Sequence, residues 1–249
     1  MLNFAASGNW ISAGSHGLLI AAVVTLAFAA VARLIRGVSR SGAVAGAIVA
    51  FVLYVTLGAG AFVALVSVFV LAWLTTRFGY SRKEQRGTAE KSDGRNAAQV
   101  FANLGVAAIA ALLYGYFGSG TFILAAIAAL GEAAADTVSS EYGQARNETA
   151  VLITNLQEVP AGTDGGITWT GTLAGIFAAL IISLVCVAVR LLPWRLFWIP
   201  TVAAVLGMVV DSLLGACLER KNFLNNNAVN FLSTLSAAST AGMLLRSFA

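Results

Sequence analysis

The chain has 249 residues, of which 59% are hydrophobic and only 10% are charged. A water-soluble domain carries more charge than this, so the composition excludes a soluble enzyme and predicts a polytopic helical membrane protein. The net charge of +4 reflects basic residues in the loops of such a protein, so it does not indicate nucleic-acid binding. No Lys or Arg precedes Arg33, so we do not expect a secretory signal peptide.

Eight segments of the chain are long and apolar enough to approach the roughly 20 residues that a spanning helix needs. They lie near residues 17–33, 42–57, 59–78, 97–117, 121–141, 170–190, 197–218 and 228–246. We therefore expect an all-α transmembrane bundle of seven or eight spanning helices, forming a single domain over residues 1–249. Residues 1–16 are polar enough to form an N-terminal tail or an interfacial helix.

The basic residues predict the orientation of this bundle. If the N-terminus lies outside, most of the 15 Lys and Arg residues fall in inside loops, as the positive-inside rule requires. The two long polar loops, near residues 79–96 and 142–169, are then cytoplasmic. Gly42–Gly46 and Gly171–Gly175 have GxxxG spacing, which is typical of close helix packing.

The two cysteines, Cys186 and Cys217, fall on different predicted helices near opposite faces of the membrane. We therefore expect no disulfide between them.

Two acidic residues stand inside the fifth hydrophobic segment, which is where charge is least expected. Burying an unpaired carboxylate in hydrocarbon costs several kcal/mol, so an intramembrane acid indicates a functional site. The spacing places Glu132, Asp136 and Ser140 on one face of a helix. Two acids on one face repel each other unless a cation lies between them. Because carboxylate oxygens suit Mg²⁺, we predict a magnesium site here.

Glu132 and Asp136 are the first candidates for ligands of this ion, and Glu141 and Asp211 are further candidates. Asp211 also lies among apolar residues, near the inner end of the seventh segment. The alternative for Asp136 is a structural ion pair with Arg95 or Arg77.

Three amide side chains repeat at helical spacing where the fourth segment begins. Asn96, Gln99 and Asn103 form one face, preceded by the Asp93-Gly94 turn and by two cations, Lys91 and Arg95. Amides and cations beside a helix N-terminus suit an anion such as phosphate. The alternative is interhelical hydrogen bonding with cations that extend toward the membrane surface.

A glycine-rich stretch, Gly162-Thr163-Asp164-Gly165-Gly166, precedes the sixth segment. Successive glycine N–H groups can form a concave site for phosphate oxygens, and the dipole of the following helix points at the same place. The chain contains no GxxxxGKS or GxxxxGKT motif, so this is not a P-loop. Glycine-rich turns also precede many helices without binding anything.

A run of asparagines opens the last segment. Asn227, Asn230 and Thr234 share one helical face, and an Asn amide can bind a nucleobase edge, a phosphate or an ion. Helix capping by Asn225 or Asn226 is the simpler explanation for part of the run. Taken together, the polar clusters predict a site for a divalent metal and an anionic ligand at the cytoplasmic boundary. That combination fits a phosphorylated amphiphile that meets a nucleotide.

Several short motifs together resemble one family of integral membrane proteins, typified by transmembrane protein 19 and the plant chloroplast phytyl-phosphate kinase. They span about residues 33–246 in the order of that family and are Thr76-Arg77-Phe78-Gly79, DGRNAAQVFAN, Ala135-Asp136-Thr137 with Ser140-Glu141, VPAGTDGG, Gly207 to Gly215, and Asn226-Asn227 with Val229-Asn230-Phe231. Ala228 departs from the family, whose members often carry a polar or acidic residue there, so the substrate specificity of this chain can differ.

The resemblance implies a kinase that phosphorylates a prenyl monophosphate, such as phytyl or geranylgeranyl phosphate, with a nucleoside triphosphate, CTP being favoured. The catalytic residues are expected to be Asp136, Glu132, Arg95 and Asp211, with Mg²⁺ held by Glu132, Asp136, Glu141 and Asp211. The residues expected to bind substrate or nucleotide are Lys91, Asp93, Asn96, Gln99, Asn103, Thr137, Ser140, Gly162, Thr163, Asp164, Gly165, Gly166, Asn227 and Asn230.

Two other functions use the same residue types. Intramembrane acids and amides also form the pathways of ion or solute transporters, although a transporter places them near the middle of the bilayer. A CDP-lipid type cytidylyltransferase would use the same metal and nucleotide but would release pyrophosphate. A purely structural role leaves the buried acids without a purpose.

Overall fold

The computed structural model describes residues 15–146 and 148–247. Eight of its helices are long and apolar enough to cross a membrane, which confirms the predicted all-α polytopic fold. These helices are α1 (Ser15–Leu34), α2 (Arg40–Leu57), α3 (Ala59–Arg77), α5 (Ala97–Phe117), α6 (Gly120–Ala145), α7 (Trp169–Ala188), α8 (Trp198–Leu214, within the longer helical span Trp194–Glu219) and α9 (Asn226–Ser247). Of the predicted N-terminal tail, residues 1–14 lie outside the described residues, and the last two begin α1.

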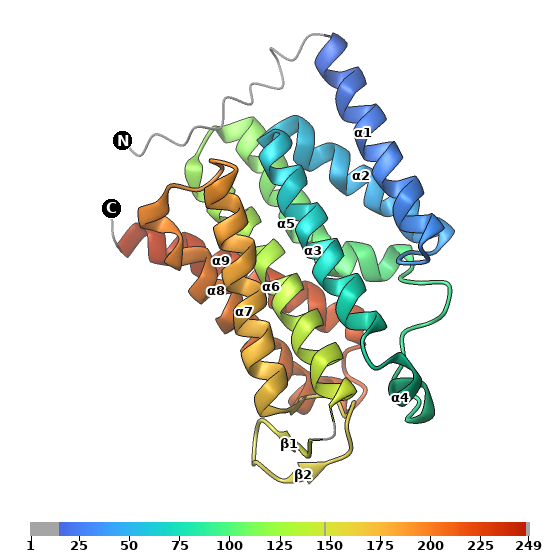
Figure 1. The fold of residues 1–249 in the computed structure, drawn as a ribbon. Helices are drawn as coiled ribbons and strands as arrows, with labels where there is room; N and C mark the ends of the chain where they lie inside the picture. The colour runs from blue at the N-terminus through green and yellow to red at the C-terminus, as the bar shows by residue number, and fades with distance from the viewer. Residues whose placement is uncertain (1–14, 147, 248–249) are drawn as a thin grey trace.

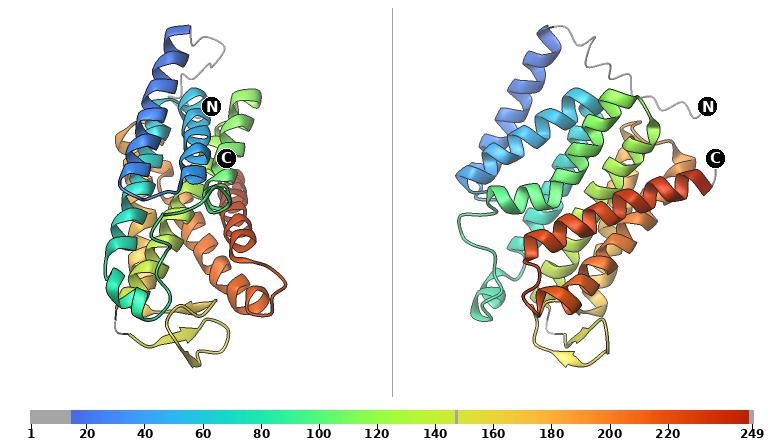
Figure 2. Two further views of the ribbon diagram at one scale, coloured as in Figure 1. Left: turned by 90° about the vertical axis from the view of Figure 1, so that its right-hand side faces the viewer. Right: turned by 180° about the vertical axis from the view of Figure 1, so that it is seen from behind.

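Helix α6 lies at the centre of the bundle, surrounded by α3, α5, α7, α8 and α9 (Figures 1 and 2). Its first half, from Ile123 to Leu130, consists of buried Ala, Ile and Leu side chains. Helix α1 packs on α2 at the edge of the bundle. Three of the four acids predicted to form the site, Glu132, Asp136 and Glu141, are therefore carried by the helix that is best shielded from lipid.

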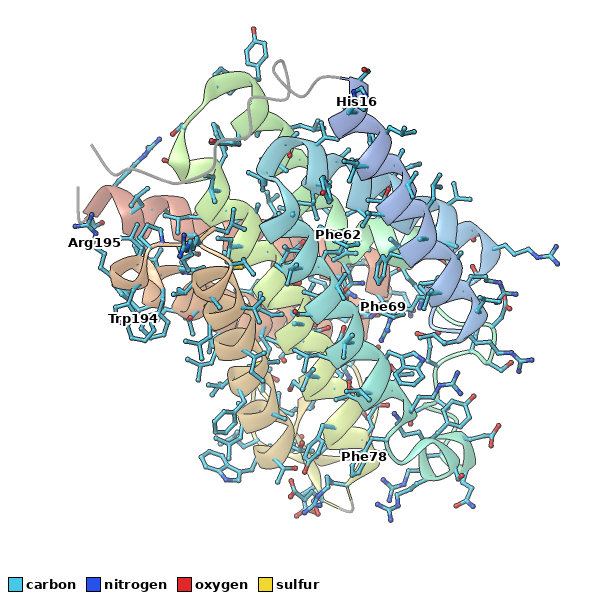
Figure 3. The ribbon with its side chains drawn as sticks, turned by 45° about the horizontal axis from the view of Figure 1, so that its top comes forward. His16, Phe62, Phe69, Phe78, Trp194 and Arg195 are labelled. Atoms are coloured by element: carbon cyan, nitrogen blue, oxygen red, sulfur yellow. The ribbon has the colours of Figure 1, made fainter. Side chains whose placement is uncertain are left out.

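The outer faces of the helices carry exposed apolar side chains, as a lipid-facing surface requires. Phe62 and Phe69 of α3 pack edge-on against Phe28 of α1, with ring centroids 5.6 and 5.3 Å away (Figure 3). Trp194, in the short helix η1 (Trp194–Leu196), stacks on Phe197 at one end of the bundle. Tryptophan is enriched where a helix meets the membrane surface, so this end fits an interface.

Glycines let α6 and α7 approach closely. A Cβ atom added at Gly171 would lie 2.6 Å from the carbonyl oxygen of Ser139, and one at Gly175 would lie 2.8 Å from that of Ala135. Gly42 of the other GxxxG pair faces the backbone of Arg95, whereas Gly46 faces open space. The packing function predicted for these pairs holds for Gly171–Gly175 and for one residue of Gly42–Gly46.

The two predicted polar loops contain secondary structure that the sequence analysis did not predict. The first includes the short helix α4 (Tyr80–Gln85). The second holds a three-stranded antiparallel sheet in the order β2-β1-β3, formed by β1 (Ala150–Leu152), β2 (Glu158–Val159) and β3 (Gly166–Ile167). Both lie at the end of the bundle where α6 finishes (Figure 1). At that end α8 continues into a π-helical turn, η2 (Gly215–Glu219).

Candidate functional site

A polar cavity of about 410 Å³ lies at the end of the bundle that carries the sheet. Its walls come from α5, α6, α8, η2 and α9, from the segment after α4, and from the loop between β2 and β3. The volume is within the range of small-molecule sites in proteins. The cavity therefore gathers segments from most of the sequence into one place.

Most of the predicted site residues line this cavity. They are Lys91, Arg95, Gln99, Asn103, Asp136, Thr137, Ser140, Glu141, Gly162, Thr163, Asp164, Gly165, Gly166, Asp211 and Asn230. Four predicted residues are not among its lining: Asp93, Asn96, Glu132 and Asn227. Asp93 is exposed and pairs with Arg33 at 2.8 Å, on the far side of the segment that carries Arg95.

Asp136 of α6 and Asp211 of α8 approach each other in the cavity wall, close enough for their charges to interact. Neither makes an ion pair in the described part of the chain, and Oδ2 of Asp211 is buried without a hydrogen-bond partner. The structural ion pair considered for Asp136 is not formed in the described residues. Arg95 instead pairs with Glu141 at 3.5 Å, and Arg77 donates to the carbonyl of Ile35 at 3.0 Å.

Glu132 lies one turn deeper than Asp136 and is 1% exposed. Its Oε1 atom has no hydrogen-bond partner. It packs where Gly207 leaves room, since a Cβ atom there would lie 2.6 Å from Cγ of Glu132. It therefore lies beneath the carboxyl groups of Asp136 and Asp211 without lining the cavity.

A magnesium ion fits two of these carboxylates rather than a cage of them. Within residues 15–146 and 148–247, no three His, Cys, Asp or Glu side chains are arranged to hold a metal ion. Mg²⁺ commonly uses one or two carboxylates and completes its shell with waters and substrate phosphates. The unpartnered oxygen of Asp211 beside Asp136 is consistent with that mode.

Glu141, a further predicted metal ligand, is already occupied. Its Oε2 accepts a hydrogen bond from Nζ of Lys83 at 2.5 Å, and its Oε1 accepts from Oγ1 of Thr76 at 2.9 Å. The guanidinium of Arg95 lies 3.5 Å from Oε1. With donors on both oxygens, Glu141 acts as an ion-pair partner, which corrects its prediction as a metal ligand.

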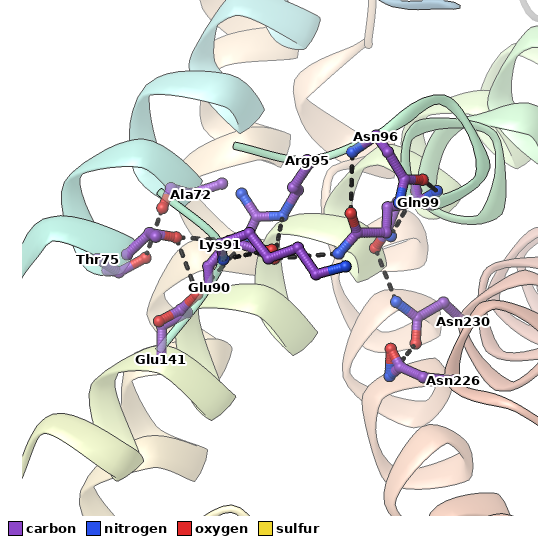
Figure 4. Close-up of polar contacts among 12 residues, drawn as sticks. Ala72, Thr75, Glu90, Lys91, Arg95, Asn96, Gln99, Glu141, Asn226 and Asn230 are labelled. Atoms are coloured by element: carbon purple, nitrogen blue, oxygen red, sulfur yellow. Dashed lines mark hydrogen bonds and ion pairs between the residues drawn. The ribbon is translucent and has the colours of Figure 1, made fainter. Parts of the chain in front are cut away.

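The amide face of α5 has two separate roles. Asn96 and Gln99 form a capping box at the start of α5, so the side chain of Asn96 serves the helix and lies outside the cavity lining. Gln99 also donates to Oε2 of Glu90 at 3.1 Å. Asn103 donates to the carbonyl oxygen of Gln99 at 2.9 Å and accepts from Asn230 of α9 at 3.3 Å (Figure 4).

The asparagine run before α9 divides in a similar way. Asn225 accepts a hydrogen bond from the N–H of Ala228 at 2.9 Å, which is the capping function considered for it. Asn226 and Asn230 both line the cavity, and Nδ2 of Asn226 donates to Oδ1 of Asn230 at 3.5 Å. Asn227 does not line the cavity. The pair of asparagines that lines the cavity is therefore Asn226 and Asn230, four residues apart on the helix, and not the predicted pair Asn227 and Asn230.

The glycine-rich loop lines the cavity, but not all of its N–H groups are free for a phosphate. The N–H of Gly166 donates to the carbonyl of Thr163 at 2.8 Å, so it is used within the turn. The N-terminus of α7 is also occupied, since Thr168 accepts from the N–H of Gly171 and Glu148 accepts from that of Thr170. The N–H groups of Thr170 and Gly171 are therefore used within the protein, and a contribution of the α7 dipole to ligand binding stays a prediction.

Three charged residues were not singled out from the sequence. Lys83 is buried against Glu141, and Glu90 lies beside Arg95 at 3.9 Å. Glu219 lines the cavity from η2, where its charge interacts with those of Asp164 and Asp136. Polar residues at loop ends are common, so nothing in the sequence distinguished these three from solvated charges.

The cavity therefore gathers several carboxyl groups that lack a cationic partner. Among the described residues, four lining carboxylates make no ion pair: Asp136, Asp164, Asp211 and Glu219. The cations in the lining are Lys91 and Arg95, and Arg95 is already paired. An anionic ligand would enter such a cavity together with a cation that balances these carboxylates.

Residues 23–238 match the family described as integral membrane protein DUF92. The chain is 32% identical to an uncharacterised membrane protein of Methanocaldococcus jannaschii over 218 residues, which cover 88% of this chain and 90% of that protein. It is 29% identical to protein VTE6, chloroplastic, of Arabidopsis thaliana over 98% of this chain and 74% of that protein. Protein PGR of Arabidopsis thaliana is 28% identical over 80% of this chain and 86% of that protein. No solved structure matches the chain.

Proposed function

We propose that this chain, which belongs to the DUF92 family of integral membrane proteins and is similar to the chloroplast protein VTE6, is a membrane-embedded prenyl-phosphate kinase. It would transfer the γ-phosphoryl group of a nucleoside triphosphate, with CTP favoured, to a monophosphate such as phytyl or geranylgeranyl phosphate. The observation that carries this proposal is the cavity itself, where unpaired carboxylates face two cations at one end of a lipid-facing bundle.

The acceptor needs little activation in such a reaction. The second pKa of a phosphate monoester is about 6, so its attacking oxygen is largely ionised at neutral pH. That oxygen would form a bond to the γ-phosphorus as the bond to the bridging oxygen breaks and the nucleoside diphosphate leaves. A strong general base is not required, so the protein's contribution is positioning and charge neutralisation.

Each group of lining residues has a part in that positioning. Asp136 and Asp211 would hold Mg²⁺, which would neutralise the triphosphate charge when bound. Lys91 and Arg95 would contact phosphate oxygens. Asn103 and Asn230 present amide groups that can orient the nucleobase or the acceptor. The prenyl chain would remain in the bilayer, beside the apolar faces of the helices.

The position of the cavity argues against a transport pathway. Beyond Asp136 and Glu132, the central helix continues through buried apolar residues from Leu130 back to Ile123. A transporter needs polar groups and access on both sides of this layer. The residues that line the cavity instead belong to the end of the bundle where α6 finishes, which we place on the cytoplasmic side because the positive-inside rule favours it.

The direct test supplies purified protein with Mg²⁺, several nucleoside triphosphates and several isoprenoid monophosphates, and identifies the products by mass spectrometry. We expect a prenyl diphosphate and a nucleoside diphosphate, and Asp136→Asn should lower the rate at least about 100-fold. Glu84→Gln removes an exposed acid of α4 outside the cavity lining and should retain the rate. Release of pyrophosphate would instead indicate cytidylyl transfer, and ion flux without nucleotide would indicate transport.

A further inference from the structure

Lys83 is completely buried although it belongs to a six-residue helix at the end of the bundle. Its ammonium group donates to the carbonyl oxygens of Thr75 at 3.1 Å and Thr76 at 2.8 Å, and to Oε2 of Glu141 at 2.5 Å. An ammonium group has three N–H donors, so all of them are used. Lys83 does not line the cavity, and therefore it cannot contact a ligand there.

Stability alone does not explain this arrangement. Thr75 and Thr76 lie in the last turn of α3, whose free carbonyl groups a lysine can satisfy from the surface. Here the lysine is instead buried with a carboxylate from α6. Removing two charges from water costs about as much as their attraction returns, so such pairs contribute little to stability. The position of Glu141 suggests another purpose.

Glu141 connects the buried lysine to Arg95. Its Oε1 lies 3.5 Å from Nη2 of Arg95, and the same guanidinium nitrogen donates to Oγ1 of Thr76 at 3.3 Å. The neighbouring Nε atom of Arg95 lies 3.9 Å from Oε2 of Glu90. Within the described residues, Nη1 of Arg95 makes no hydrogen bond. The guanidinium is thus held along the edge formed by Nε and Nη2 (Figure 4), and Arg95 lines the cavity.

The backbone of Arg95 is fixed as well. Its carbonyl accepts from the N–H of Ser39 at 2.9 Å, and its own N–H donates to the carbonyl of Gly37 at 3.3 Å. Gly42 of α2 packs directly against the same carbonyl oxygen, where a side chain would not fit. The backbone N–H and carbonyl groups of Arg95 are therefore both held by residues that do not line the cavity.

We propose that Lys83 and Glu141 are a positioning pair whose function is to hold the Arg95 guanidinium in place for a phosphate oxygen. The pair orients Arg95 and does not itself touch the ligand. This inference rests on the proposed function, because it takes a nucleotide or acceptor phosphate as the ligand of Arg95. Lys83 thereby receives a positioning role, and Glu141 receives a positioning role in place of the predicted role as a metal ligand.

A test needs variants that separate positioning from folding. Lys83→Met and Glu141→Gln each leave the opposite charge buried without its partner, so both are expected to lower thermal stability. The double variant removes both charges and should regain much of that stability. Glu141→Asp provides a second route, because it keeps both charges but withdraws the carboxylate from Arg95 by one methylene group.

Two readouts apply to each folded variant. The first is the rate at which phenylglyoxal modifies Arg95, followed by mass spectrometry of the peptide that contains it. The second is the KM for nucleoside triphosphate beside kcat. In the double variant and in Glu141→Asp, we expect faster modification and a KM raised roughly ten- to a hundredfold, the scale of misplacing a catalytic group. Arg77→Gln, which removes a guanidinium outside the cavity lining, should change neither readout.

A double variant of wild-type stability with unchanged modification rate and KM would show that the pair is only structural and would overturn the proposal. The same holds if Glu141→Asp leaves both readouts unchanged. If the wild-type protein shows no nucleotide-dependent activity, the proposed kinase function fails, and the modification rate of Arg95 still tests whether the pair holds this side chain.

Discussion

The side-chain amide of Asn230 donates a hydrogen bond to Oδ1 of Asn103 over 3.3 Å, although 127 residues separate them in the chain. This contact joins α9 to α5 at the cavity wall. On one side, Asn226 donates to the side chain of Asn230. On the other, Asn103 donates to the backbone carbonyl of Gln99, whose side-chain amide donates to Glu90. Interhelical packing and ligand binding, posed as alternatives for these residues, are therefore compatible: the same amides link the helices and line the cavity.

The Asn103–Asn230 contact should contribute measurably to stability. We expect Asn230→Ala to lower the free energy of unfolding by about 1 kcal/mol, with an interaction energy of about 0.6 kcal/mol in a double-mutant cycle with Asn103→Ala. Unfolding in mixed detergent micelles measures both values. Asn227→Ala is the matched control, because this neighbour on α9 does not line the cavity. An interaction energy near zero would contradict a direct hydrogen bond between the two amides.

The spanning helices could be predicted closely from hydropathy alone, because lipid demands about 20 apolar residues in each. The predicted fifth segment, 121–141, differs from α6 (Gly120–Ala145) mainly at its polar end, where four more residues continue the helix. The intramembrane acids Asp136 and Asp211 were also evident from the sequence, since a charge among apolar residues is conspicuous. These features depend on local composition, which a sequence states directly.

Features that depend on distant contacts could not be predicted in the same way. Glu141 resembled a metal ligand because Lys83, which neutralises it, lies 58 residues earlier in a polar loop. Glu219 reached the cavity because α8 ends in a π-helical turn, which changes the helical register and carries no sequence signature. The strands β2 and β3 have two residues each, too few to produce an alternating pattern.

Gly165 should be intolerant of a side chain for a reason beyond its backbone conformation. Its φ is 72°, and a Cβ atom there would overlap the backbone and side chain of Ala216 in η2. Gly87 has the same φ of 72° but faces open space. Each change to Ala costs about 1–2 kcal/mol in backbone strain, and Gly165→Ala should cost more because it also displaces the loop. Thermal unfolding of the two variants isolates that difference.

The functional consequence of the same pair of variants should differ as well. Gly165→Ala moves the loop that lines the cavity, so we expect a higher KM for nucleotide, whereas Gly87→Ala should leave the KM unchanged. Equal effects of the two variants on stability and KM would mean that the contact between Gly165 and Ala216 does not shape the cavity.

Asp136 and Asp211 should lower stability while they serve the function. Neither carboxyl group has an ion-pair partner among the described residues, and Oδ2 of Asp211 has no hydrogen bond, so Asp136→Asn or Asp211→Asn is expected to raise the free energy of unfolding by about 0.5–2 kcal/mol. Added Mg²⁺ should stabilise the wild-type protein by about 2.7 kcal/mol at a concentration 100 times its Kd, and should stabilise neither variant. Melting curves with Mg²⁺ and with EDTA give both quantities, and an equal Mg²⁺ effect on all three proteins would exclude these ligands.

The two native cysteines can determine which side of the membrane the cavity faces. Cys217 is exposed in η2, directly beside the cavity-lining residues of that turn, whereas Cys186 is buried in α7, and both are free. If the cavity is cytoplasmic, a membrane-impermeant maleimide should label Cys217 in inside-out vesicles and not in right-side-out vesicles. Cys186 is buried and should remain unlabelled in both, which makes it an internal control for folding. Labelling of Cys217 from the outer face would reverse the orientation, and would require the nucleotide to reach Asp136 and Asp211 from outside the cell.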